Sequence, residues 1–295
     1  MSLFSNPEAV PSRIIGAWRY LAMDSGDDVL DAVLKQDLMP DTVLPDRKGD
    51  RRGVLSQSLK AGIEIGLFES SGEEDLSRIR LAPDASTVDP AEDEVCRDVL
   101  ADLLLDSDNG NDGFAIALAW FLCQSPFGRP LRDKEPPTLP GKIQEAGLQD
   151  RTGITSDASS GAFRHWCTYL GFADSHKFDG NAAVSPDPTR YLSGRLPQIV
   201  EATGERVPLL EVIRRLSQRC PVLEGGAYRD EVETLLDVSR PERHLSETTS
   251  LALLRLTDRG VIDLYEESDA ANVMVLQKGN QSPRYSHLIL NDPRD

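Results

Sequence analysis

The chain of 295 residues contains no apolar run near the roughly 20 residues that a membrane-spanning helix requires. Its first residues also lack a basic segment followed by an apolar one, so we expect no secretory signal. Cysteine is scarce, and the four cysteines lie far apart without a CxxC pair, which is typical of reduced thiols in a cytosolic protein. These absences predict a cytoplasmic protein that does not associate with membranes.

Positive charge is also in deficit. The formal net charge is −17, and acidic residues outnumber basic ones in each third of the chain. Affinity for duplex DNA comes largely from neutralised phosphates, so an acidic protein binds DNA only where its cations gather on one face. The charge balance therefore makes a protein partner at least as good an expectation as duplex DNA.

Sequence motifs for catalysis are missing as well. The Gly141-Lys142 pair has Pro136 where a P-loop needs its first glycine, and no GxSxG elbow occurs. The four histidines form no HExxH motif and no zinc-ligand spacing with cysteine. Residues 106–113 resemble a calcium loop, but Ala119 stands where a bidentate glutamate is needed. We therefore expect no enzyme activity, no catalytic residues, no cofactor and no metal.

What the sequence does contain is a segment that occurs three times. Each copy has apolar residues at helical spacing, then a glycine, two apolar residues and a polar turn. The copies span residues 55–68, 160–173 and 249–262, with their glycines at Gly66, Gly171 and Gly260. Glycine readily adopts the left-handed conformation that ends a helix. Each copy is therefore typical of the third helix and first wing strand of a winged helix.

The predicted fold is mainly α with small β wings (α+β), built from tandem winged-helix units. The expected domains are a winged helix at 1–84, a helical segment with a winged-helix-like domain at 85–205, and a third winged helix at 206–295. In the middle domain, residues 178–184 and Tyr191-Leu192 would form the wing. In the last domain, residues 207–218 would form the first helix.

The most concentrated group of basic residues lies around the start of the third helix of the first winged-helix unit. It consists of Arg47, Lys48, Arg51, Arg52 and Lys60, with the polar residues Ser56 and Gln57 on the same helix. In a DNA reader, Arg51 and Arg52 would contact phosphate while the helix residues face the groove. The alternative is a solvated loop whose charges offset acidic neighbours. The other copies offer Arg164, Thr249, Arg255 and Arg259 as contacts for DNA or a protein partner.

The three winged-helix-like units, the run from Phe163 to Phe172 and the following Pro186-Asp187-Pro188-Thr189-Arg190 resemble the DpdG family. This family comprises accessory proteins of bacterial gene clusters that put 7-deazaguanine derivatives into DNA and restrict DNA lacking them. The resemblance implies a non-enzymatic adaptor or DNA-engaging subunit of an anti-phage defence complex, with helicase-like or nuclease-like partners. The alternative is a free-standing winged-helix transcriptional regulator that binds duplex DNA. An enzyme is the third interpretation.

Overall fold

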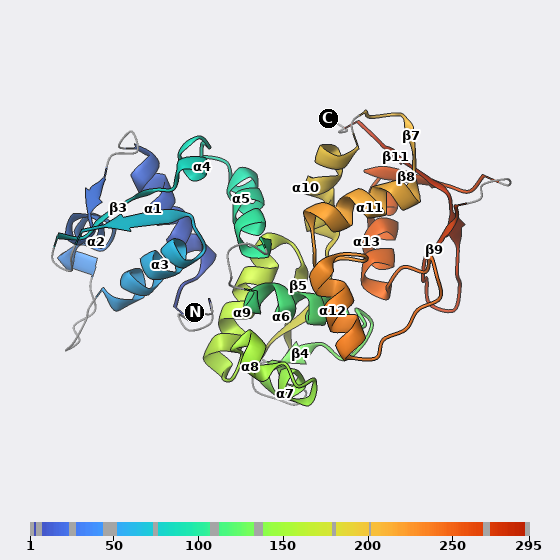
Figure 1. The fold of residues 1–295 in the computed structure, drawn as a ribbon, viewed down its shortest axis with the longest axis horizontal. Helices are drawn as coiled ribbons and strands as arrows, with labels where there is room; N and C mark the ends of the chain where they lie inside the picture. The colour runs from blue at the N-terminus through green and yellow to red at the C-terminus, as the bar shows by residue number, and fades with distance from the viewer. Residues whose placement is uncertain are drawn as a thin grey trace. The chain divides into compact units, whose positions relative to one another are not determined.

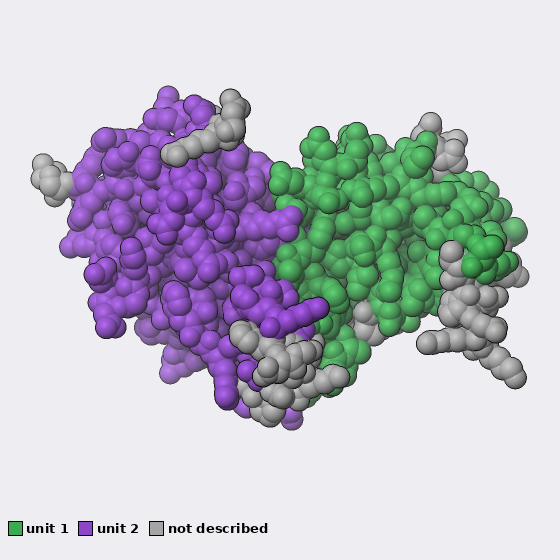
Figure 2. Space-filling model, turned by 180° about the vertical axis from the view of Figure 1, so that it is seen from behind, with its two compact units in different colours: residues 1–114, 149–169 green, residues 115–148, 170–295 purple. Residues whose placement is uncertain are grey.

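The computed structural model describes residues 3, 8–23, 28–43, 52–72, 76–106, 112–132, 138–178, 181–200, 202–267 and 272–292. The chain divides into two compact units, which Figure 2 shows in different colours. Unit 1 comprises Met1–Phe114 and Gln149–Tyr169, and unit 2 comprises Ala115–Leu148 and Leu170–Asp295. The predicted domain boundaries at 84/85 and 205/206 do not coincide with this division, and they stay predictions.

The mainly helical fold with small β elements is confirmed (Figure 1). Up to the end of α5, the elements are α1 (Pro11–Met23), β1 (Val29–Leu30), α2 (Asp31–Leu38), the 3-10 helix η2 (Asp41–Val43), α3 (Gly53–Glu64), β2 (Phe68–Ser71), β3 (Arg78–Leu81), α4 (Pro83–Ser86) and α5 (Asp93–Leu105). Next come α6 (Gly113–Leu122), β4 (Leu131–Arg132), α7 (Leu139–Glu145), α8 (Gln149–Thr152), α9 (Asp157–Leu170), β5 (Ala173–Phe178) and β6 (Asn181–Pro186).

The remaining elements all belong to unit 2. They are α10 (Thr189–Ile199), β7 (Arg206–Pro208), α11 (Leu209–Arg219), α12 (Ala227–Leu235), α13 (Glu247–Asp258), β8 (Ile262–Tyr265), β9 (Met274–Val275), β10 (Arg284–Tyr285) and β11 (His287–Leu290).

One strand order recurs in three antiparallel sheets. The sheets are β1-β3-β2, β4-β6-β5 and β7-β11-β8, so in each of them the last strand along the chain lies in the middle. A helix precedes the first strand each time, and α3, α9 or α13 precedes the second strand. We call the three sets of elements the first, second and third repeats. The first and second repeats thus have the order helix, strand, helices, strand, strand, and in the third repeat β9 and β10 lie between β8 and β11.

A common backbone contact follows the last helix of each repeat. Gly66, Gly171 and Gly260 have φ values of 81°, 88° and 69°, as their helix-ending role predicts. The carbonyl group of the residue after each glycine accepts a hydrogen bond from the residue that follows the middle strand. The donor and acceptor pairs are Ala82 N to Leu67 O at 3.0 Å, Asp187 N to Phe172 O at 2.9 Å and Asn291 N to Val261 O at 2.9 Å. The threefold repeat seen in the sequence is therefore also a repeat of backbone geometry.

The prediction that Tyr191 and Leu192 form a wing strand is wrong. Both residues lie in α10, because the segment before them starts a helix. The Asp187 carboxylate accepts hydrogen bonds from the Thr189 backbone N–H at 3.0 Å and from the Thr189 hydroxyl. Helix α10 packs against α11 and α13, as α1 packs against α2 and α3. The third repeat thus begins with α10, and the helix predicted at 207–218 is its second.

Each unit has its own apolar core. In unit 1, the fully buried Trp18 and Phe68 come from α1 and β2, and the Trp166 indole donates a hydrogen bond to the Ala9 carbonyl at 2.8 Å. In unit 2, residues 115–122 of α6 are all buried, which accounts for a helix that is apolar on every side. The cores bury one side of each of α3 and α13.

Candidate nucleic-acid interface

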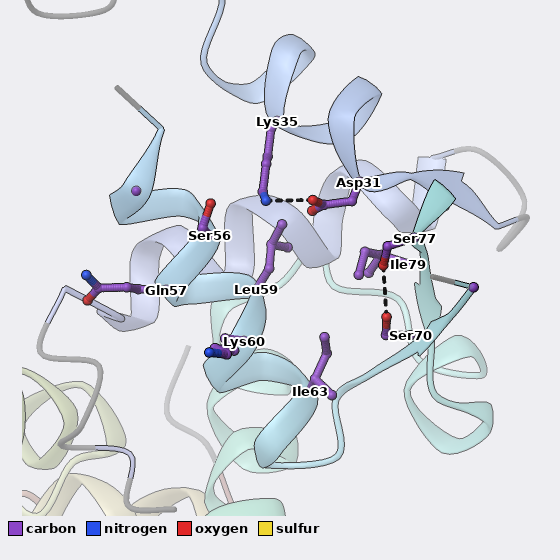
Figure 3. A pocket seen from close by; sticks show the side chains of 12 residues that line it. Asp31, Lys35, Ser56, Gln57, Leu59, Lys60, Ile63, Ser70, Ser77 and Ile79 are labelled. Carbon is purple, nitrogen blue, oxygen red and sulfur yellow. Dashed lines mark hydrogen bonds and ion pairs between the residues drawn. The ribbon is translucent and has the colours of Figure 1, made fainter. Parts of the chain in front are cut away.

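A groove on unit 1 lies between α3 and the wing strands of the first repeat (Figure 3). Its volume is about 490 Å³. Helix α2 also contributes to its wall. The polar and charged lining residues are Asp31, Lys35, Ser56, Gln57, Lys60, Ser70 and Ser77. The groove therefore offers hydroxyl, amide and ammonium groups on one side of the unit.

Charge in the groove is partly neutralised by an ion pair within α2. Asp31 begins this helix, and Lys35 follows one turn later, so their side chains meet with Nζ and Oδ2 2.6 Å apart. The Asp31 backbone N–H donates a hydrogen bond to the Ser77 carbonyl at 2.9 Å, which fixes α2 to the wing. Lys60 on α3 is exposed and has no ion-pair partner in the part of the chain that the structure describes. Lys60 thus gives the groove its uncompensated positive charge.

The amide of Gln57 is a second polar group of interest on α3. Its Oε1 atom is buried and accepts no hydrogen bond from any described residue. Ser56, by contrast, donates its hydroxyl to the Arg52 carbonyl at 3.4 Å within its own helix. Of the predicted contact residues on α3, Lys60 therefore has an exposed charged group, and Gln57 has an amide oxygen that is unsatisfied but buried.

Arg52 does not fit the expected role of an exposed phosphate contact. Its Nε donates to the Met39 carbonyl at 3.0 Å, and its Nη2 donates to Gln36 Oε1 at 2.5 Å and Asp41 Oδ1 at 2.8 Å. Its side chain is 24% exposed. The guanidinium group thus connects the start of α3 to the end of α2. Arg47, Lys48 and Arg51 lie outside the described residues.

Replacing Arg52 with alanine should lower the free energy of unfolding by about 1–3 kcal/mol, because one guanidinium supplies all three hydrogen bonds. Lys60→Ala is the control, since Lys60 is exposed on the same helix. That change should alter stability by about 0.5 kcal/mol or less. Urea unfolding of both variants measures the difference. Equal stability of the two variants would show that the Arg52 contacts contribute nothing.

Most of the candidates on the second and third repeats are buried or half-buried. The prediction that Thr249 faces outward is wrong, since it is 1% exposed and its hydroxyl donates to the buried Glu224 carboxylate. Arg255 is half-buried and forms an ion pair with Asp187. Arg259 is exposed at the end of α13, and Arg164 on α9 is half-buried. Arg259 alone among these four has the exposure expected of a contact residue.

Four polar or charged lining residues of the groove were not among the sequence candidates: Asp31, Lys35, Ser70 and Ser77. The hydroxyl groups of Ser70 and Ser77 lie 3.1 Å apart across the wing. The i, i+4 spacing of Asp31 and Lys35 was the available signal for a charged helix face. No local pattern indicates that this face borders α3, because the contact depends on how the wing pairs with β1.

The thiol groups have little nucleophilic character. Burial raises the pKa of Cys167 to about 12 and that of Cys123 to about 11, so the thiolate is nearly absent at neutral pH. None of the four cysteines forms a disulfide bond. Among the described residues, no group of three or more histidine, cysteine or acidic side chains is arranged to hold a metal ion. No described helix has the length and apolar character needed to cross a membrane.

Comparison with known proteins gave one match. A protein-family model described as DpdG-like matches residues 1–270, which confirms the resemblance seen in the sequence. No curated protein and no solved structure matched the chain.

Proposed function

The chain belongs to the DpdG-like family, and from this membership we propose that it is a non-enzymatic adaptor or DNA-engaging subunit of a bacterial restriction or anti-phage defence complex. The family points to an association with DNA-modification and defence systems. In this proposal the protein works in the cytoplasm beside helicase-like or nuclease-like subunits. Each repeat is a winged helix in this interpretation, and the groove of the first repeat contacts duplex DNA.

The observation that carries the DNA-contact part is the position of Lys60 and Gln57 on α3. A winged helix presents one face of its third helix to nucleic acid, and these two polar groups lie on that helix in the groove beside the wing. The net charge of −17 supports the adaptor part, because so acidic a chain attracts DNA weakly by itself. A partner subunit would then supply most of the affinity. Nucleophilic chemistry has little support from Cys123 and Cys167, because desolvation raises the pKa of both thiols.

Charge reversal of Lys60 tests the DNA contact. Lys60→Glu should weaken binding of the chain to every duplex sequence by about tenfold and flatten the salt dependence by about one unit, because it removes one phosphate contact. The wild type should bind with a Kd of about micromolar or weaker at physiological salt. The measurement is a salt titration of fluorescence anisotropy with a labelled duplex.

Arg219→Glu is the matched control for this titration. Arg219 is an exposed arginine at the end of α11, outside the groove, so its reversal should leave the salt slope unchanged. An unchanged slope in a folded Lys60→Glu variant would exclude the first groove as the DNA contact. Nanomolar, sequence-specific binding by the isolated wild type would instead favour the transcriptional regulator.

A further inference from the structure

A second hollow lies on unit 2, beside the small β9–β10 hairpin of the third repeat. Its volume is about 480 Å³. Segment 242–244, just before α13, forms one wall, and the hairpin forms the other. The lining residues are Glu242, Arg243, His244, Val273, Val275, Ser282 and Arg284. Two arginines and a histidine thus border one hollow on a chain that is otherwise strongly acidic.

Strand register explains why basic side chains lie on the same face of the sheet here. Val275 in β9 is paired with Arg284 in β10 on one side and bridged to His244 on the other. Residues paired across neighbouring strands project on the same face of a sheet. His244 and Arg284 therefore flank Val275 on one face, roughly 10 Å apart at two strand spacings. The His244 ring is oriented by a contact of 3.1 Å between Nδ1 and the Glu242 carbonyl.

Arg243 has an unusual backbone conformation at this place. Its φ is 64°, in the left-handed region that glycine adopts easily and arginine does not. The Arg243 carbonyl accepts a hydrogen bond from Val275 N–H at 2.9 Å, and Leu245 N–H donates to the Val275 carbonyl at 3.0 Å, which hold the segment in place. Strained residues of this kind cluster at binding sites. Glycine would adopt this backbone conformation without strain, so the presence of arginine instead indicates a role for its side chain.

We propose that this hollow binds a phosphate group, held by Arg243 and Arg284 with His244 and Ser282 as further hydrogen-bonding groups. The planar guanidinium fork matches phosphate geometry and forms charge-assisted hydrogen bonds with it. The one acidic side chain of the lining, Glu242, is 87% exposed, and its Oε1 lies 3.5 Å from Arg243 Nε. The Glu242 carboxylate competes with phosphate for Arg243, but its exposed side chain can turn into solvent. The phosphate belongs either to a DNA backbone or to a small phosphorylated molecule.

This inference goes beyond the proposed function, because phosphate binding here depends neither on the first groove nor on a defence role. The chain has four histidines, so the imidazole C–H signals form a simple NMR spectrum. Titration of the full chain with inorganic phosphate should shift the His244 signal with a Kd in the millimolar range. A short duplex DNA should shift the same signal if the phosphate is part of a backbone.

Four variants sharpen the test. Arg284→Gln and Arg243→Gly should each weaken phosphate binding by about tenfold, which is the effect of losing one charge-assisted interaction. Arg243→Gly should keep or raise the melting temperature, because glycine relieves the left-handed conformation. Glu242→Gln should strengthen binding by about threefold, since it removes a competing carboxylate. Arg219→Gln, at an exposed site in the same unit, should change nothing.

Each result has one meaning. A His244 shift with both probes assigns the hollow to DNA backbone, and a shift with inorganic phosphate alone assigns it to a small phosphorylated ligand. If His244 responds to neither probe, or if Arg284→Gln binds like the wild type, the proposal is wrong. A loss of DNA affinity in Lys60→Glu without any effect at Arg284 would leave the proposed function standing and remove only this site.

Discussion

Replacing Glu224 with alanine should lower the free energy of unfolding by about 3–5 kcal/mol, because the change removes a buried charge that its neighbours need. Glu224 is buried in unit 2. Its Oε1 accepts the Ser246 backbone N–H at 2.8 Å, and its Oε2 accepts the Thr249 hydroxyl. Without the carboxylate, both donors would be buried without a partner.

The buried charge of Arg229 should increase the loss of stability in Glu224→Ala. Arg229 is 1% exposed, its Nε bonds Glu233, and its Nη1 and Nη2 make no hydrogen bond to any described residue. Glu224 and Glu233 together compensate its charge electrostatically. Removing Glu224 therefore leaves a buried guanidinium with less compensation. Glu224→Gln keeps an acceptor but removes the charge, so its smaller loss should isolate the electrostatic part.

The effect of Glu224 should depend on pH. Burial opposes its ionisation, but the Arg229 charge and the hydrogen bonds from Ser246 and Thr249 together outweigh burial and hold the pKa of Glu224 below its ordinary value of 4.5. A carboxylate with a lowered pKa stabilises the fold above its unfolded pKa, and this stabilisation is lost as the pH falls through its folded pKa. The difference between wild type and Glu224→Ala should therefore shrink below about pH 4.5.

Urea unfolding at neutral and acid pH measures this difference directly. Glu205→Ala is the control, because Glu205 is an exposed glutamate in the same unit. It should change stability by about 0.5 kcal/mol or less at either pH. A Glu224→Ala variant as stable as this control at neutral pH would show that the buried network makes no net contribution.

Replacing Gly171 with alanine should cost about 3 kcal/mol or more, through strain and a clash together. Gly171 has a φ of 88°, where an L side chain is strained. A Cβ atom there would lie 2.8 Å from Tyr191 N and 3.1 Å from Arg190 Cβ. These atoms belong to the start of α10, and Tyr191 N–H donates to the Gly171 carbonyl at 3.1 Å. Backbone rather than a flexible side chain would have to move.

Gly147→Ala separates strain from clash. Gly147 follows α7 in the same unit, has a φ of 69°, and would place a Cβ atom in open space. This variant should cost only about 1–2 kcal/mol, the price of the left-handed conformation alone. Chemical unfolding followed by circular dichroism compares the two. If both variants lose the same free energy, the approach of α10 to Gly171 is not tight in solution.

The repeat itself could be read from the sequence, because its signals are local. Apolar residues at helical spacing and a glycine after them determine where a helix runs and where it ends, whatever surrounds it. The three glycines accordingly have the expected positive φ values. The mainly helical fold and the DpdG-like family were likewise available from the residues alone.

What tertiary structure decided is which polar side chains face outward. Thr249 follows the Ser246 cap of α13 and resembles a solvent-facing residue, but Glu224, 25 residues earlier, reaches its hydroxyl and buries it. Arg52 was expected at a DNA surface, yet Met39 and Asp41 accept its hydrogen bonds. Both outcomes depend on partners from other elements, which the spacing of residues within one helix does not specify.

Helix packing and strand pairing are likewise decided by contacts that the local sequence does not specify. The Pro186-Asp187-Pro188 segment was expected to lead into a wing strand, but the hydrogen bonds of Asp187 with Thr189 and the packing of α10 on α13 make it the start of a helix. His244 and Arg284 flank the same residue only because both pair with Val275. The sequence by itself determined the helix that recurs in each repeat, the glycine that ends it and the repeat. The fold alone brought residues distant in the chain to one face, because hydrogen bonds between strands and burial act across any sequence separation.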